Sequence, residues 1–128
     1  MTVERREEIA LVTLARPRGN AFTPELVSEL RRVVGEARDA RGLVLTSALP
    51  RLFSGGWDLP DLTPRPFEEF EAFVSSYCDL VREVFAFGAP VIAALPGSAV
   101  AGGLIGVAVL AALGRVVELG GLESLQAS

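Results

Sequence analysis

The sequence predicts an α/β fold, because short apolar segments typical of strands alternate with longer amphipathic segments typical of helices. The strand segments are residues 8–14, 43–47 and 90–95. The helix segments, 24–40 and 67–84, repeat apolar residues every three or four positions. A strand, a helix and a second strand in succession favour parallel pairing through a helical crossover. We therefore expect one domain, built on a parallel sheet.

The first helix has clear start and stop signals. Thr23 supplies an N-cap hydroxyl, Pro24 occupies the first helical position, and Glu25 lies in the first turn. Gly42 ends the segment before the next strand. Its apolar face consists of Leu26, Leu30, Val33, Val34 and Ala37.

The second helix carries an aromatic stripe along one face. We interpret this stripe as core packing, because the spacing is typical of a buried helix face. Its residues are Phe67, Phe70, Phe73, Val74, Tyr77, Leu80, Val81 and Val84. The stretch ALPRLFSGGWDLPDLTPRP precedes this helix and is rich in proline and glycine. A loop of that length inside a domain is typically functional or disordered, and its large apolar residues argue against disorder.

The stretch PGSAVAGGLIGVAVLAALG, residues 96–114, has no charged residue and admits two interpretations. As a membrane helix it is short, because its unbroken part, Ser98 to Gly114, falls below the roughly 20 residues needed to cross a bilayer. Gly102 and Gly106 form a GxxxG pair, which allows close backbone packing in a membrane or in a core. We favour a glycine turn followed by a buried helix.

The composition excludes several kinds of chemistry. The chain has no histidine and no lysine, so its twelve basic residues are all arginine. A histidine-based relay, a Schiff base and a histidine metal ligand are therefore excluded. Cys78 is the single cysteine, which rules out an internal disulfide or a cysteine zinc site and suits the cytoplasm. The net charge of −4 argues against a nucleic-acid partner.

Two glycine turns follow two of the predicted strands, FSGGWDL after the second and PGSAVAGGL after the third. The carboxyl ends of parallel strands gather at one edge of a sheet, where ligands bind. Paired glycines allow a close backbone approach to a ligand. Either turn alone is more simply a tight turn without a ligand. Together they predict two backbone N–H donors that stabilise a developing oxyanion.

The motifs RPRGNAFTPEL, GLVLTS, RLFSGGWDL and PVIAALPGSAVAGG, in this order, resemble the enoyl-CoA hydratase/isomerase family, also called the crotonase superfamily. The resemblance runs from about residue 8 to about residue 110. It implies a crotonase-like spiral of repeated ββα units that binds acyl-CoA thioesters. The implied substrate contains coenzyme A, and no separate cofactor or metal is expected.

The resemblance assigns roles residue by residue. The oxyanion donors would be the backbone N–H groups of Trp57 and Gly102. Asp58 matches a family aspartate that we expect to brace its loop, and Arg16 and Arg18 flank the expected CoA groove. The residues expected at the substrate are Arg18, Asn20, Ala21, Ser54, Gly55, Gly56, Asp58, Leu59, Gly103 and Ile105.

The sequence also departs from the family pattern. Ile105 occupies the position at which hydratases carry their first catalytic glutamate. Only Glu118 and Glu123 remain to serve as the second. The chain is about half as long as the family usually is, and the pattern is lost after about residue 110. We therefore expect a single domain, 1–128, that lacks the C-terminal half of the family fold.

These observations lead to one expected function and two alternatives. The expected function is a crotonase-like lyase or isomerase of fatty acid metabolism that stabilises a thioester enolate, with no general base identified. The alternatives are a non-catalytic remnant that binds acyl-CoA or a full-length relative, and a membrane-associated polypeptide. The high apolar content, 50% of residues, predicts a homo-oligomer, and the resemblance implies a trimer or hexamer. No nucleic acid and no membrane partner are expected.

Overall fold

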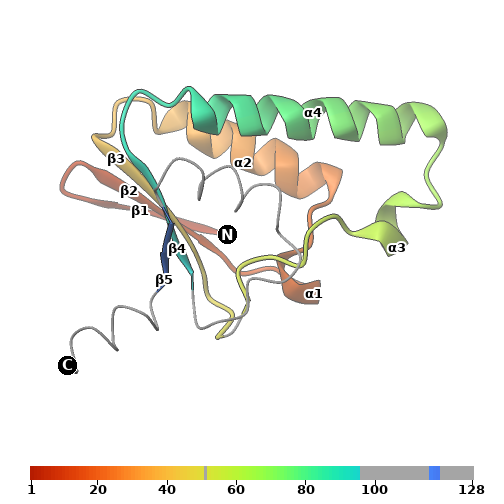
Figure 1. The fold of residues 1–128 in the computed structure, drawn as a ribbon, viewed down its shortest axis with the longest axis horizontal. Helices are drawn as coiled ribbons and strands as arrows, with labels where there is room; N and C mark the ends of the chain where they lie inside the picture. Colours follow the sequence, from red (N-terminus) through yellow and green to blue (C-terminus); the bar gives the residue numbers. More distant parts are fainter. Residues whose placement is uncertain (51, 96–115, 119–128) are drawn as a thin grey trace.

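The protein is described by a computed structural model that covers residues 1–50, 52–95 and 116–118 (Figure 1). The strands are β1 (Thr2–Arg6), β2 (Ile9–Leu14), β3 (Gly42–Ser47), β4 (Val91–Leu95) and β5 (Val116–Glu118). The helices are α1 (Pro17–Asn20), α2 (Pro24–Glu36), α3 (Leu59–Leu62) and α4 (Phe67–Phe85).

The described strands form one sheet in the order β1-β2-β3-β4-β5. β1 pairs with β2 in antiparallel fashion, whereas β2, β3, β4 and β5 are parallel neighbours. The crossover from β2 through α2 to β3 confirms the parallel pairing that the sequence predicts. Because β3 and β4 are adjacent and parallel, the chain leaves both at the same edge of the sheet.

Two strands lie outside the sequence prediction. β1 is exposed along its whole length and has the sequence TVERR, so it carries no alternating apolar pattern. Its pairing with β2, from Thr2 with Thr13 to Arg6 with Ile9, supplies backbone hydrogen bonds that a search for apolar periodicity does not detect. β5 pairs with β4 in a region where the sequence offers no recognisable pattern.

Helix α2 begins as predicted and ends earlier than predicted. The Thr23 hydroxyl accepts a hydrogen bond from Leu26 N at 3.2 Å, and this bond caps the first turn. The helix ends at Glu36 rather than at residue 40. Ala37 has already left helical geometry, with ψ of 10°, yet it and Ala40 remain buried. Their burial in the following turn continues the apolar pattern past the end of the helix.

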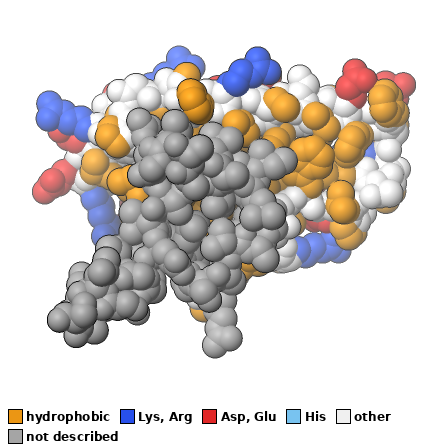
Figure 2. All heavy atoms as spheres, viewed as in Figure 1, with side chains coloured by type: hydrophobic (Ala, Val, Ile, Leu, Met, Phe, Trp, Pro, Cys, Tyr) orange, Lys and Arg blue, Asp and Glu red, His pale blue; other side chains and the backbone are white. Residues whose placement is uncertain are grey.

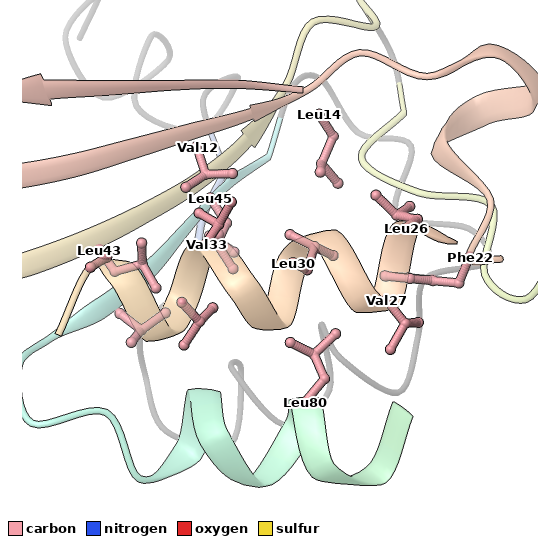
Figure 3. Close-up of a cluster of buried hydrophobic side chains, with 14 of the residues drawn as sticks. Val12, Leu14, Phe22, Leu26, Val27, Leu30, Val33, Leu43, Leu45 and Leu80 are labelled. Carbon is pink, nitrogen blue, oxygen red and sulfur yellow. The ribbon is translucent and has the colours of Figure 1, made fainter. Parts of the chain in front are cut away.

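The core lies between the sheet, α2 and α4 (Figure 3). Val12, Leu43 and Leu45 project from the strands toward α2, and Leu80 of α4 meets α2 from the other side. The aromatic stripe of α4 packs as predicted except at Phe67. That side chain is 71% exposed, because it occupies the first residue of the helix, beyond the neighbouring elements.

No helix in the described segments is both long enough and apolar enough to span a membrane. The predicted buried helix over 98–114 and its glycine turn lie outside the described residues. Their arrangement therefore stays a prediction.

Candidate functional site

The candidate site forms where the turn after β2 meets the loop after β3. The turn is α1 with its flanking residues, 16–22, and the loop is the described part of the stretch after β3, 52–58. The two segments follow neighbouring parallel strands, so both reach the carboxyl edge of the sheet. This edge is where the sequence places the first glycine turn.

The turn has an unusual left-handed backbone. Arg18, Gly19 and Asn20 have φ values of 61°, 67° and 54°. Asparagine and glycine tolerate this conformation, whereas arginine rarely adopts it. A side chain at Gly19 would also meet Leu52 Cδ2 at 2.7 Å, but that atom ends a flexible side chain that can move, so the positive φ is the reason for glycine here. The turn therefore brings its backbone close to the loop.

The buried Asn20 side chain joins the turn to its surroundings. Its amide nitrogen donates to Ser47 Oγ at 2.8 Å and to the carbonyl of Phe53 at 2.9 Å. Its amide oxygen accepts a hydrogen bond from Arg16 N at 2.7 Å. Asn20 is fully buried, so these bonds compete with no solvent. One side chain thus fixes the end of β3, the turn and the loop relative to each other.

A second set of bonds completes the connection. Ser54 Oγ donates to the carbonyl of Asn20 at 2.8 Å and accepts from Gly56 N at 3.1 Å. The N–H of Gly55 donates to the carbonyl of Gly19 at 2.8 Å. Gly56 has φ of 84°, a conformation that glycine adopts without strain. The loop conformation is therefore set by buried polar contacts from the turn.

These contacts leave the N–H of Trp57 without a partner in the described part of the chain. Phe22 forms a parallel bridge with Trp57, in which Phe22 N donates to Gly56 O and Asp58 N donates to Phe22 O. In a parallel bridge the flanking residues bond across, so the residue between them directs its own N–H away. The Trp57 N–H is therefore held in a fixed direction and has no partner among the described residues.

The Trp57 side chain packs against the aromatic stripe of α4. Its ring meets Phe73 at 5.3 Å, Tyr77 at 5.5 Å and Phe70 at 6.1 Å, each edge to face. Phe22 meets Tyr77 in the same way at 5.5 Å. An apolar cavity of about 70 Å³ lies next to this cluster and shares Phe22 and Tyr77 with it.

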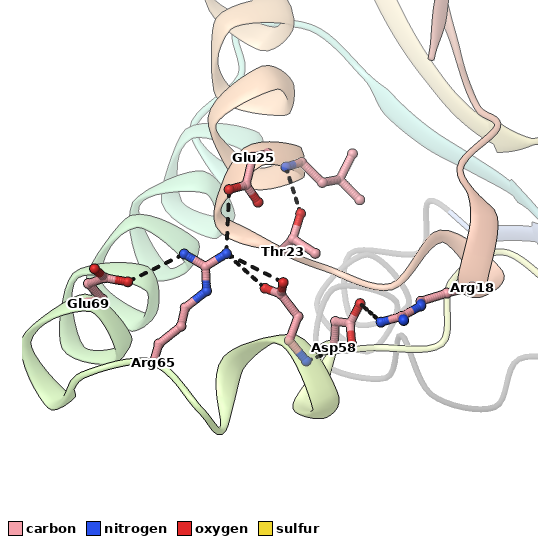
Figure 4. Close-up of polar contacts among 8 residues, drawn as sticks. Arg18, Thr23, Glu25, Asp58, Arg65 and Glu69 are labelled. Carbon is pink, nitrogen blue, oxygen red and sulfur yellow. Dashed lines mark hydrogen bonds and ion pairs between the residues drawn. The ribbon is translucent and has the colours of Figure 1, made fainter.

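Asp58 is a bracing residue in this geometry (Figure 4). Its carboxylate accepts from Asp61 N at 3.2 Å and so caps α3. The exposed Arg18 guanidinium lies 3.7 Å from the other carboxylate oxygen. Arg65 then joins α3 to α2 and α4 through Asp61 at 3.1 Å, with Glu25 and Glu69 each at 3.5 Å. The loop is thus anchored at both ends.

The structure brings most of the predicted site residues together and changes how some of them can act. The side chains of Asn20 and Ser54 are buried, so they hold the loop in place, whereas Leu59 is 58% exposed. The predicted residues that assemble here are Arg18, Asn20, Ala21, Ser54, Gly55, Gly56, Trp57, Asp58 and Leu59. Gly102, Gly103 and Ile105 lie outside the described residues.

Sequence reasoning missed three residues that build the site. Ser47 receives the Asn20 amide, Phe22 supplies the bridge, and Arg65 anchors α3. Phe22 and Ser47 had a signal, since they lie within the singled-out motifs RPRGNAFTPEL and GLVLTS. Arg65 acts through contacts with other segments, which no local pattern records.

Comparison with known proteins places the chain in a family. A family model described as enoyl-CoA hydratase/isomerase matches residues 4–113. The human and bovine proteins named enoyl-CoA hydratase domain-containing protein 2, mitochondrial, are each 36% identical over 86 residues. That alignment covers 67% of this chain and 29% of each relative, so the chain spans well under half of their length.

Solved structures show the same relation. AtuE of Pseudomonas aeruginosa superposes with a TM-score of 0.74 at 28% identity, covering 84% of this chain and 44% of that one. An enoyl-CoA hydratase of Thermoplasma volcanium gives a TM-score of 0.67 at 27% identity, covering 75% and 40%. The α/β architecture agrees with the expectation from the sequence, and the chain covers less than half of each of these two structures. The chain belongs to the enoyl-CoA hydratase/isomerase family.

Proposed function

We propose that this chain binds the thioester group of an acyl-CoA and stabilises negative charge on the thioester oxygen with backbone N–H donors. The observation that supports the proposal most directly is the outward N–H of Trp57, held by the bridge to Phe22. A donor that is fixed before the ligand arrives costs no reorganisation when charge develops. The second donor of the proposed pair is the N–H of Gly102, outside the described residues.

The proposed chemistry stops at stabilising an enolate-like state. Asp58 caps α3 and pairs with Arg18, so we assign it no proton transfer. Ile105 has no acidic group where hydratases of the family carry a glutamate. Adding water to a double bond needs an acid and a base on either side of it. We therefore expect hydration of crotonyl-CoA to be very weak or undetectable, as followed by loss of the enoyl absorbance.

Calorimetry with acetoacetyl-CoA and with free acetoacetate tests the proposed binding. The thioester should bind and the free acid should not, because the donors recognise a thioester oxygen attached to a long carrier. Equal binding of both compounds, or binding of neither, would overturn the proposal. If the thioester binds but a panel of CoA thioesters shows no turnover, the non-catalytic alternative is favoured.

Two glycine variants sharpen this test. Gly56→Ala forces a side chain into φ of 84°, which costs about 1–2 kcal/mol and displaces the adjacent Trp57 N–H. We expect a loss of thioester affinity of about tenfold, close to the value of one hydrogen bond. Gly35→Ala is the matched control, because no atom lies within 4 Å of the added methyl group. Unchanged affinity in both variants would contradict the role of this loop.

We also propose that the chain self-associates. Leu59 and Phe67 are 58% and 71% exposed, and they belong to the end of the molecule where α3 leads into α4. Figure 2 shows hydrophobic side chains gathered over that end. Apolar surface of this kind favours association once it reaches several hundred Å². Light scattering should report a species larger than one chain, and a monomer at high concentration would contradict this expectation.

A further inference from the structure

The indole nitrogen of Trp57 is a buried donor that has no hydrogen-bond partner in the described part of the chain. Buried tryptophan N–H groups usually find an acceptor. Leaving one unpaired costs the full desolvation penalty of the group. Nothing in residues 1–50, 52–95 and 116–118 accounts for why this penalty is tolerated.

The indole ring packs against an aromatic cluster. Three edge-to-face contacts, with Phe70, Phe73 and Tyr77, hold the ring against α4. The backbone N–H of the same residue is the proposed thioester donor. The two donors of Trp57 therefore lie within one side chain's length of each other, on a residue whose backbone and ring are both held in place.

We propose that the indole N–H of Trp57 receives a hydrogen-bond acceptor carried by the acyl group of the bound thioester. The site then prefers acyl groups with an oxygen close to the thioester carbonyl over purely hydrocarbon ones. The inference rests on the proposed function, since the thioester oxygen must first bind at the Trp57 backbone. An oxygen acceptor would form a hydrogen bond that is strengthened by the apolar surroundings, whereas a hydrocarbon group would leave the indole N–H unpaired.

The test compares acetoacetyl-CoA, which has an oxygen on its third carbon, with butyryl-CoA, which has none. Acetoacetyl-CoA should bind about five- to tenfold more tightly, the ratio expected of one neutral hydrogen bond. Replacing Trp57 by benzothienylalanine keeps a bicyclic ring of the same shape and removes the N–H. This variant should bind the two thioesters with equal affinity, so the ratio between them should fall to one.

A direct readout is available because Trp57 is the single tryptophan of the chain. Its indole proton should move downfield in the NMR spectrum with acetoacetyl-CoA and not with butyryl-CoA. If the wild-type protein binds acetoacetyl-CoA and butyryl-CoA equally, this inference is overturned and the proposed function stands. If neither thioester binds, both the inference and the proposed function are overturned.

The free protein provides a further check. If the N–H has no partner before the ligand binds, its removal should leave the melting temperature unchanged or raise it. A clear drop in the melting temperature of the benzothienylalanine variant would show that the chain itself already supplies an acceptor. That result would overturn the inference.

Discussion

The packed scaffold of β2, α2, β3 and α4 and the paired loops of the candidate site are held together by different forces. The scaffold relies on apolar contacts, with Leu26, Val27 and Leu43 fully buried. The loops rely on buried polar groups, chiefly Asn20 and Ser54. Apolar packing scales with buried area and has no preferred direction, whereas a buried hydrogen bond requires a defined distance and angle. Apolar packing therefore keeps this protein folded, whereas buried polar contacts set the conformation of the candidate site.

The largest expected effect is on the scaffold. Leu26→Ala removes a fully buried side chain from α2 and should lower the free energy of unfolding by about 3 kcal/mol. Denaturant titration measures the loss. Ser28→Ala, at an exposed position of the same helix, serves as the control and should change stability little. Both variants should retain their thioester affinity under folded conditions. A large loss of affinity in Leu26→Ala would show that the scaffold also positions the candidate site.

A smaller effect on stability and a larger one on binding are expected at Asn20. Asn20→Asp removes the two bonds donated to Ser47 and Phe53, which should cost about 2 kcal/mol. The loop then loses its position, so we expect thioester affinity to fall about tenfold, as for one lost hydrogen bond.

Asn20→Gly separates the two possible causes of that loss. Glycine tolerates the φ of 54° but lacks the amide. We expect affinity to fall in this variant as well, as measured by calorimetry. Wild-type affinity in Asn20→Gly would show that the backbone conformation, and not the amide, positions the loop.

The N-cap of α2 gives an effect of intermediate size that belongs to the scaffold alone. Thr23→Ala removes the hydroxyl that accepts from Leu26 N and should cost about 1 kcal/mol of stability. Thr23→Ser retains the hydroxyl and should keep most of the stability that Thr23→Ala loses. Thermal unfolding of both variants measures the two losses. An equal loss in both would assign the effect to the threonine methyl group.

The smallest expected effect concerns pH. A hydrogen bond from its own backbone N–H lowers the pKa of Glu25 below the ordinary value of 4.5, with further help from Thr23 and Arg65 against the opposing effect of burial. A lowered pKa stabilises the fold above that ordinary value, and the contribution is lost as the pH falls through the folded pKa.

The exposure of Glu25 and its Arg65 contact limits this contribution to a few tenths of a kcal/mol. Glu25→Gln should therefore lose slightly less stability than the wild-type protein between pH 6 and pH 3. Denaturant titration at each pH provides the comparison. Identical pH profiles would mean that the contact network around Arg65 does not depend on this charge.

Local signals in the sequence determined the scaffold. Thr23 and Pro24 mark the start of α2, apolar runs mark β2, β3 and β4, and helical spacing marks α4. These features could be predicted because each depends on neighbours within a few residues. The predictions failed where non-local contacts decide the outcome. β1 is stabilised by pairing with β2, and Phe67 is exposed because it lies at the end of a helix.

Part of the candidate site could be predicted from the sequence, and part depends on the tertiary structure. The motifs indicated the first glycine turn, and the family resemblance they carry implied the roles proposed for Asp58 and for the Trp57 N–H. Only the tertiary structure decided that Asn20 faces inward, because its amide bonds to Phe53, 33 residues away, and its carbonyl accepts from Ser54, 34 residues away. A hydrogen bond between distant segments forms only after the apolar core has brought those segments together, so no local pattern predicts it.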